Sequence, residues 1–341
     1  MRLAGTKIVI EPPDYIISAY KHRDFAPVVE LLQSVFPCEP ITESSFTRRV
    51  ILDPNFNPQG AFVAHNQAGD VIGFILAMVR RRPLEDAPWD VDRGWITLFG
   101  VAEQMRNQGI GSKLLWTAEE WLRAQGRSTI WISPYAPNYW TPGVDEATCM
   151  AGLAFLQRRG YTVSYRPLSM DLSLVGWQPP DWIVAKRNEY KQAGELRQQA
   201  EIKSQGIRLE IFSPAYAGQV MDFLKQEFPG DWQRYVRDAM LNMLNGRRPC
   251  EELHLLLQGE TVIGFAHCEG ERFGPFGVAK VCRGKGLGAL LLYDTLCEMQ
   301  RRGWHNAWFL WTDDATAERL YKPAGFRETR RYAVLCKKMI L

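Results

Sequence analysis

Apolar and polar positions follow the same order in two separate blocks of the chain. In the first block an apolar run, Gly69–Val79, precedes Trp95–Gly126, where a β-rich run leads into apolar residues at helical intervals. In the second block Gly259–Gly270 precedes Phe273–Gly303 with the same change of pattern. Because strands alternate with a period of about two residues and helices with about 3.6, each block predicts strands followed by a long amphipathic helix.

The ends of the two blocks also match. Each continues through a short aromatic strand near Trp131 or Trp308 to a helix that ends in a Gly-aromatic pair, at Gly160 or Gly325. The repeat distance of about 170 to 180 residues is too long for a solenoid and suits duplicated domains. Strands alternating with helices predict an α/β (mixed α+β) fold, with two domains that each combine a mixed β-sheet with flanking helices.

The stretch between the blocks has a different character. A Pro-Pro pair at 179–180 breaks regular structure, and the polar residues after it are good helix formers. We therefore predict an N-terminal domain over residues 1–175, a helical linker over 176–206 and a C-terminal domain over 207–341.

Composition narrows the possible classes of protein. The 341 residues are 46% hydrophobic, with 41 basic against 38 acidic side chains, which suits a globular protein without the basic excess of a nucleic-acid binder. No run approaches the roughly 18 apolar residues of a membrane span, and the N-terminus lacks the apolar core of a signal peptide. Seven irregularly spaced cysteines favour reduced thiols. We expect a cytoplasmic monomer or homodimer that binds neither nucleic acid nor membrane.

The strongest local signal is a pair of glycine-rich hexamers, Arg106–Gly111 and Arg283–Gly288, each between a strand and a helix. Glycine lets a ligand approach the backbone, and successive N–H groups at a helix start favour phosphate oxygens. A Walker A loop would need a closing Lys-Ser/Thr, which is missing after Gly288. A dinucleotide fingerprint would need G-x-G-x-x-G, whereas glycines 284, 286 and 288 are spaced G-x-G-x-G.

Both hexamers match the pattern [RQ]-x-x-G-x-[GA], and in this the chain resembles the GNAT superfamily of acyl-CoA-dependent N-acyltransferases. The resemblance covers most of residues 207–341 and, more loosely, about 15–170. It implies a splayed sheet in each domain, with acetyl-CoA (acyl-CoA) as cosubstrate. The cofactor-binding residues that it implies in the C-terminal domain are Phe276, Gly277, Val278, Arg283, Gly284, Lys285, Gly286, Leu287, Gly288, Ala289 and Asp314. Those that it implies in the N-terminal domain are Val101, Arg106, Asn107, Gln108, Gly109, Ile110 and Gly111.

The two halves differ at the position of the acid. In the GNAT pattern a tyrosine four residues before the terminal glycine protonates the leaving thiolate, and Tyr321 stands there in the C-terminal half. The same register in the N-terminal half gives Leu156, which cannot donate a proton. This asymmetry is similar to that of mycothiol synthase, a tandem GNAT architecture whose C-terminal domain does the chemistry. We predict a catalytically degenerate N-terminal domain.

The general base is less sharply defined. Glu269 and Glu271 precede the cofactor strand, where GNAT enzymes often hold a glutamate that works through water, although a solvated hairpin would carry the same acids. We predict that one of them is the base, with Glu271 slightly ahead. The residues Cys250, His254, His267 and Cys268 do not follow the usual zinc spacings, so no metal is expected.

These residues predict an enzyme that transfers an acetyl group from acetyl-CoA directly to a primary amine of a small molecule, with the chemistry in the C-terminal domain. One alternative keeps the chemistry and makes the acceptor an amine of a protein or peptide. A second alternative, suggested by the degenerate first domain, is a non-enzymatic acyl-CoA-binding sensor. Tyr321 argues against the sensor, because a sensor has no need of an acid.

Overall fold

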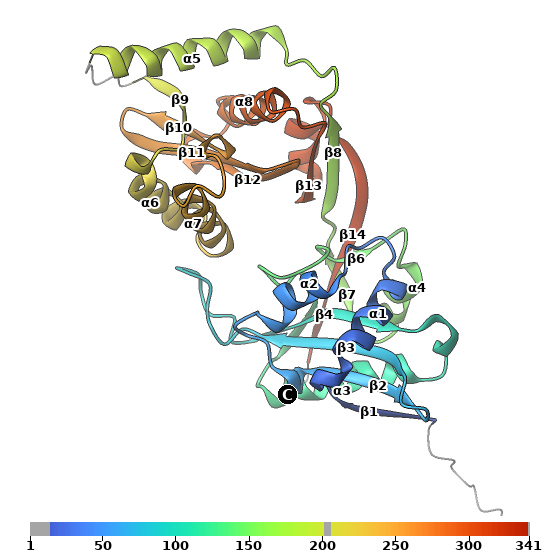
Figure 1. The fold of residues 1–341 in the computed structure, drawn as a ribbon. Helices are drawn as coiled ribbons and strands as arrows, with labels where there is room; N and C mark the ends of the chain where they lie inside the picture. Colours follow the sequence, from blue (N-terminus) through green and yellow to red (C-terminus); the bar gives the residue numbers. More distant parts are fainter. Residues whose placement is uncertain (1–13, 201–205, 340–341) are drawn as a thin grey trace, which may run out of the picture.

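The computed structural model describes residues 14–200 and 206–339. Within these residues the chain forms two α/β domains, one above the other in Figure 1, that are joined by strands running between them. Each domain combines a mixed sheet with helices on its two faces. The fold class expected from the alternation of strands and helices is therefore confirmed.

In the N-terminal domain the first strands pair with their neighbours in chain order, from β1 to β5. The pairs are antiparallel except for β4 with β5, which is parallel. The strands are β1 (Tyr15–Ala19), β2 (Ala61–Asn66), β3 (Val71–Val79), β4 (Arg93–Val101), β5 (Thr129–Ile132), β6 (Val144–Asp145), β7 (Thr162–Tyr165) and β8 (Leu168–Ser173). The helices are α1 (Phe25–Val35), α2 (Glu43–Phe46), α3 (Ile110–Ala124) and α4 (Met150–Gln157).

Strand β3 is buried on both faces of this sheet. Phe74 packs with Leu32 of α1 on one face, and Ile75 packs with Leu114 of α3 on the other. A strand that faces two cores carries apolar residues at almost every position, which explains the continuous apolar run in the sequence.

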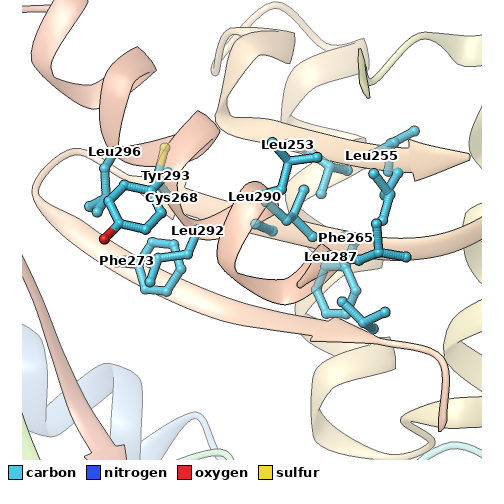
Figure 2. Close-up of a cluster of buried hydrophobic side chains, with 14 of the residues drawn as sticks. Leu253, Leu255, Phe265, Cys268, Phe273, Leu287, Leu290, Leu292, Tyr293 and Leu296 are labelled. Atoms are coloured by element: carbon cyan, nitrogen blue, oxygen red, sulfur yellow. The ribbon is translucent and has the colours of Figure 1, made fainter. Parts of the chain in front are cut away.

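The C-terminal domain repeats the arrangement, with β9 to β12 paired in antiparallel order and β12 parallel to β13. Side chains of α8 pack on one face, where Figure 2 shows Leu292 of α8 beside Phe273 of β12, while Phe265 of β11 meets aromatic rings of α6 and α7 on the other. The strands are β9 (Ile207–Ile211), β10 (Leu253–Gln258), β11 (Thr261–Glu269), β12 (Arg272–Val278), β13 (Asn306–Thr312) and β14 (Arg327–Lys338). The helices are α6 (Ala217–Glu227), α7 (Asp231–Leu244), α8 (Leu287–Arg301) and α9 (Asp314–Thr316), the last continued by a π-helical turn over Ala317–Tyr321.

The two sheets exchange their last strands. β8, which closes the N-terminal block of the sequence, lies between β13 and β14. β14 pairs with β8 through Arg327–Arg331 and with β5 and β7 through Val334–Lys338, so a single sheet runs through both domains. The predicted domain limits, 1–175 and 207–341, divide the chain by sequence position and remain a prediction, whereas the strand exchange could not be seen from the sequence pattern.

Ion pairs fasten β14 to the N-terminal domain. Lys337 lies 2.9 Å from Glu119 of α3, and Arg330 lies 2.6 Å from Asp145 of β6. Both carboxylates are largely buried, so removing either basic partner would leave a buried charge unpaired. The exchanged strands therefore fix the position of one domain against the other.

The linker forms helix α5 (Asp181–Ala200), which crosses over α8 and β9 in Figure 1. Its side chains Arg187 and Lys191 pair with Asp294, a buried carboxylate on α8 that also lies 2.7 Å from Nδ1 of His254. Burial alone would raise the pKa of Asp294, but His254, Lys191 and Arg187 outweigh burial and hold that pKa well below its usual range. No helix among the described residues is long and apolar enough to cross a membrane.

Replacing Asp294 by alanine is expected to destabilise the protein by about 3–5 kcal/mol, because His254, Arg187 and Lys191 would lose the carboxylate that they share. The measurement is urea unfolding at pH 7. Asp222→Ala removes an exposed carboxylate from α6 and serves as the control, with an expected change below about 0.5 kcal/mol.

The Asp294 cluster also makes the free energy of unfolding depend on pH in a predictable direction. Because the folded-state pKa of Asp294 is depressed, its contribution is fully present above about pH 4 and is lost as the pH falls further. The stability gap between wild type and Asp294→Ala should therefore narrow in acid. A gap that is constant from pH 7 to pH 3 would contradict this account of the cluster.

Candidate active site

The two glycine-rich loops share one backbone conformation. Gly109 caps α3 at φ 84° and Gly286 caps α8 at φ 76°, both in the left-handed region. Two residues earlier in each loop, Asn107 has φ 63° and Gly284 has φ 77°. An added Cβ at Gly284 or Gly286 would meet no described atom within 4 Å. The backbone at these two glycines is therefore open to a ligand, as a phosphate-binding loop requires.

The arginine that begins each hexamer also has an equivalent contact in both halves. Nε of Arg106 donates to the carbonyl oxygen of Val101 at 3.2 Å, and Nε of Arg283 donates to that of Val278 at 3.3 Å. Each guanidinium therefore ties its loop to the end of the preceding strand. Each arginine forms this structural contact whether or not it also contacts a cofactor.

Strands β12 and β13 diverge almost as soon as they pair. Their parallel register contains a single pair, Arg272 with Trp308, whereas β4 and β5 are paired at four successive positions. After Phe273, the pairing of β12 with β11 shifts register, and Gly274–Gly277 of this central strand are partly exposed, as is Arg272. The splay that the resemblance implies is therefore open in the C-terminal domain, beside Phe276, Gly277 and Val278.

Tyr321 lies on this open splay. Its ring is 4.3 Å from that of Phe309 on β13 and 6.1 Å from that of Phe276 on β12, and the side chain is 6% exposed. The phenol forms no hydrogen bond within the described parts of the chain. Burial, with the charge of Asp313, raises its pKa well above the usual value of 10, so the phenol keeps its proton over the whole working pH range.

The equivalent space in the N-terminal domain is filled. Phe155 of α4 packs against Phe99 of β4 with 5.7 Å between ring centroids, and both rings come within 3.7 Å of a Cβ placed on Gly111. Arg159 covers Phe155 and reaches the hydroxyl of Ser112 in the first turn of α3. At the matching glycine of the C-terminal loop, Gly288, the one described atom within 4 Å of an added Cβ is a methyl carbon of Val278, so no aromatic ring occupies that place.

Comparison with known families identifies the family to which these two domains belong. The model of the Acetyltransferase (GNAT) family matches residues 26–141 and again residues 217–326, which together make up more than half of the chain. The chain belongs to the GNAT family. It is a tandem-domain acyl-CoA-dependent N-acyltransferase, and members of the family use acetyl-CoA as cosubstrate. No curated protein matches the chain in sequence.

Solved structures show the same tandem GNAT fold at low sequence identity. One is a GCN5-related N-acetyltransferase from Sphaerobacter thermophilus, with TM-score 0.67 and 18% identity over 96% of each chain. A tandem GNAT protein of the clavulanic acid biosynthesis pathway has TM-score 0.56 and 15% identity, over 95% of this chain and 98% of the other. A fungal multi-domain GH3 β-N-acetylglucosaminidase has a glucosamine N-acetyltransferase region with TM-score 0.74 and 17% identity; it covers 96% of this chain, which spans 38% of that longer protein.

The two glutamates that were candidates for the base of this acyltransferase have different surroundings. Oε1 of Glu271 accepts the backbone N–H groups of His305 and Asn306, both at 3.1 Å, and so caps the start of β13. Glu269 instead accepts a hydrogen bond of 3.0 Å from the hydroxyl of Tyr235 on α7. Its carboxylate therefore faces a side chain rather than the backbone of the sheet.

His267, a weaker candidate, lies beside the same face of the sheet. Its ring meets that of Tyr235 edge to face at 5.4 Å. Burial lowers the pKa of His267 to about 4, so the imidazole is neutral at physiological pH. Nδ1 is enclosed without a hydrogen-bond partner within the described residues.

The remaining predicted cofactor residues lie at two places around the C-terminal loop. Asp314 is exposed and forms a bidentate ion pair with Arg331 of β14 at 2.8 and 3.2 Å, which lowers its pKa. A cavity of about 190 Å³ lies beside Lys285, Gly286 and Leu287 and is closed on its other side by α5. The linker helix therefore reaches the edge of the loop.

Sequence reasoning missed a group of residues where the domains meet. Tyr139 of the N-terminal domain packs against Trp311 of β13 at 5.8 Å, and Trp311 also stacks on Tyr165 at 6.1 Å. Arg49 reaches this group from the N-terminal domain, where its Nη1 donates to the carbonyl oxygen of Tyr139 at 2.8 Å. Arg272 comes from the C-terminal domain and is the register partner of Trp308, three residues before Trp311. The aromatic composition of residues 133–152 was the one available signal, and it does not identify which ring reaches the other domain. No group of three or more potential metal ligands occurs within residues 14–200 and 206–339.

Proposed function

We propose that this GNAT protein transfers an acetyl group from acetyl-CoA to the primary amine of a small molecule, and that the reaction occurs in the C-terminal domain. The observation that supports this most directly is the position of Tyr321. It lies on an open splay beside an intact loop, while Phe155 fills the equivalent space in the other half. The N-terminal domain would then support the active site without performing transfer.

The residues present account for both proton movements of direct transfer. The amine nitrogen forms a bond to the thioester carbonyl carbon, and the carbon–sulfur bond breaks as the tetrahedral intermediate collapses. Tyr321 donates its phenolic proton to the departing thiolate. The raised pKa makes the phenol a weaker acid, so its proton moves as the carbon–sulfur bond breaks and the sulfur becomes basic, and the phenolate then takes a proton back from solvent.

Of the two glutamates, Glu269 is the better base. Glu271 already holds two backbone N–H groups of β13, whereas Glu269 faces Tyr235 on the side of the sheet covered by α7. It would remove the proton of the attacking amine through a bridging water. Base and acid would then act from opposite faces of the splayed sheet.

Contacts between the domains favour a small acceptor. The loop between β3 and β4 reaches α7, where Asp86 accepts a 2.8 Å hydrogen bond from Gln233 and Glu85 pairs with Arg237. Together with the packing of Tyr139 on Trp311, these contacts bring the N-terminal domain toward the face of the C-terminal sheet that α7 covers. We call this the acceptor face, because the acceptor would bind there. A folded protein acceptor would have to displace these contacts.

The test is a thiol-release assay with acetyl-CoA and a broad panel of primary amines, beside peptides with a free lysine or N-terminus. Release of CoA that depends on a small amine, with the acetylated product seen by mass spectrometry, is the expected result. Transfer to the peptides alone would show that the acceptor is an amine of a protein or peptide. Tight binding of acetyl-CoA without transfer to any amine would favour a sensor.

A further inference from the structure

Two arginines from different domains flank the contact of Tyr139 with β13, and neither has a carboxylate partner of its own. Arg49 follows α2 in the N-terminal domain, and Arg272 begins β12 in the C-terminal domain. Neither forms an ion pair with any carboxylate in the described parts of the chain. Partly buried guanidiniums normally have such a partner, so their arrangement here calls for an explanation.

Each guanidinium is held by an aromatic ring and a single hydrogen bond. Nη1 of Arg49 donates to the carbonyl oxygen of Tyr139 at 2.8 Å, and its guanidinium lies 5.1 Å from the ring centre of Trp140. Nη1 of Arg272 donates to the hydroxyl of Tyr235 at 3.2 Å, and its guanidinium lies 5.3 Å from the centre of that ring. A guanidinium has five N–H donors, so most donors of both groups stay available.

The two positive charges act on each other and on Tyr139. Burial, the main cause, lowers the pKa of Arg49, and the charges of Arg48 and Arg272 lower it further. The pKa of Tyr139 is raised to about 12 by burial and by Asp231, against the opposite effect of Arg272 and Arg49. Holding like charges together costs free energy that a bound anion would recover.

The pair lies where an acceptor has to bind. Arg272 stands opposite Glu269 in the register of β12 and β11, and the hydroxyl of Tyr235 bridges the two side chains. Phe276, beside Tyr321, follows four residues later on the same strand, which is at most about 13 Å along a strand.

We propose that the acceptor is a primary amine that also carries a carboxylate, with the carboxylate bound between Arg49 and Arg272 and the amine beside Glu269. This inference rests on the proposed function and specifies its substrate class. Of the other charged groups that act on this place, Asp231 is paired with Arg234, Glu39 is paired with Arg330, and Arg48 is exposed. The two guanidiniums and Glu269 then leave a net charge of +1, which a single carboxylate neutralises better than a doubly charged phosphate group. Because one arginine comes from each domain, the site needs both halves of the chain.

The substrate arm of the test uses matched acceptors with the full-length protein. Each amino acid of a panel is assayed for acetyl transfer beside its carboxamide, its decarboxylated amine and the corresponding aminophosphonate. For the accepted amino acid, kcat/KM is expected to exceed that of the carboxamide and of the decarboxylated amine by about a hundredfold, since a buried charge pair loses its partner in both analogues. Equal transfer to carboxylate-free amines, or a preference for the phosphonate, overturns the inference.

Variants of the two arginines distinguish a loss of carboxylate binding from a general loss of folding or activity. Arg49→Met and Arg272→Met are each expected to lower kcat/KM for the amino acid about a hundredfold while leaving the carboxamide rate and the KM for acetyl-CoA within twofold. Arg48→Met changes the exposed neighbouring arginine and is the matched control. Equal losses with acid and amide would show that the arginines do not recognise the carboxylate. Absence of transfer to every amine would instead refute the proposed function, which keeps the two failures apart.

Discussion

Replacing Tyr321 by phenylalanine is expected to lower kcat by about 10²–10³-fold, the usual contribution of a general acid. The substitution removes one oxygen and keeps the ring, which packs among Phe273, Phe276, Phe309 and Phe326. The hydroxyl forms no hydrogen bond to any described residue, so its loss leaves no polar group unpaired. The core should therefore remain intact, and acetyl-CoA affinity should change by less than about twofold, since the acid acts on the leaving group in the transition state.

The measurements are steady-state acetyl transfer and, separately, equilibrium binding of acetyl-CoA. Tyr161→Phe in the N-terminal domain is the control, because it removes another buried hydroxyl, one that hydrogen-bonds to Glu119 away from the C-terminal splay. Its turnover should stay near that of the wild type. If Tyr321→Phe bound acetyl-CoA much more weakly, or kept full turnover, the assignment of the acid would be wrong.

Local signals explain why the fold and the loops could be read from the sequence. A left-handed N-cap favours glycine, so Gly109 and Gly286 can be recognised in the sequence itself. The periodicity of the helices that follow predicts which face of each helix is buried. The apolar run of β3 similarly reports a strand with a core on each face. These features depend on residues close together in the sequence.

The strand exchange depends on partners that are far apart. β14 carries a short apolar run, Tyr332–Cys336, between charged ends, and the sequence pattern does not distinguish pairing with β13 from pairing with β5 or β8. The same limit applies to Arg49 and Arg272, which both lie beside the contact of Tyr139 with β13 although more than half of the chain separates them. For Glu271, the backbone N–H groups that it accepts lie on a strand more than thirty residues away, so its structural contact had no sequence signal.

Replacing Gly286 by glutamate is expected to abolish binding of acetyl-CoA at the C-terminal site, with a loss of at least about a hundredfold. Two effects combine: Gly286 adopts φ 76°, which a side chain disfavours, and the added carboxylate would lie at the start of α8, where phosphate oxygens are expected. No described atom lies within 4 Å of the position of the new Cβ, so the charge rather than a clash is the dominant change. Binding is measured by calorimetry, and folding by circular dichroism.

Two matched variants show whether charge or backbone strain weakens acetyl-CoA binding, and which domain carries out the reaction. Gly286→Ala introduces the backbone strain without the charge, so it should weaken binding far less, by roughly the 1–2 kcal/mol that a left-handed residue costs. Gly109→Glu places the same charge on the N-terminal loop, which has the same conformation but whose neighbouring space is filled by Phe155. If the reaction occurs only in the C-terminal domain, Gly109→Glu should keep wild-type turnover while Gly286→Glu has none. The reverse result would place the chemistry in the N-terminal half, and loss of activity in both variants would mean that the two loops act together.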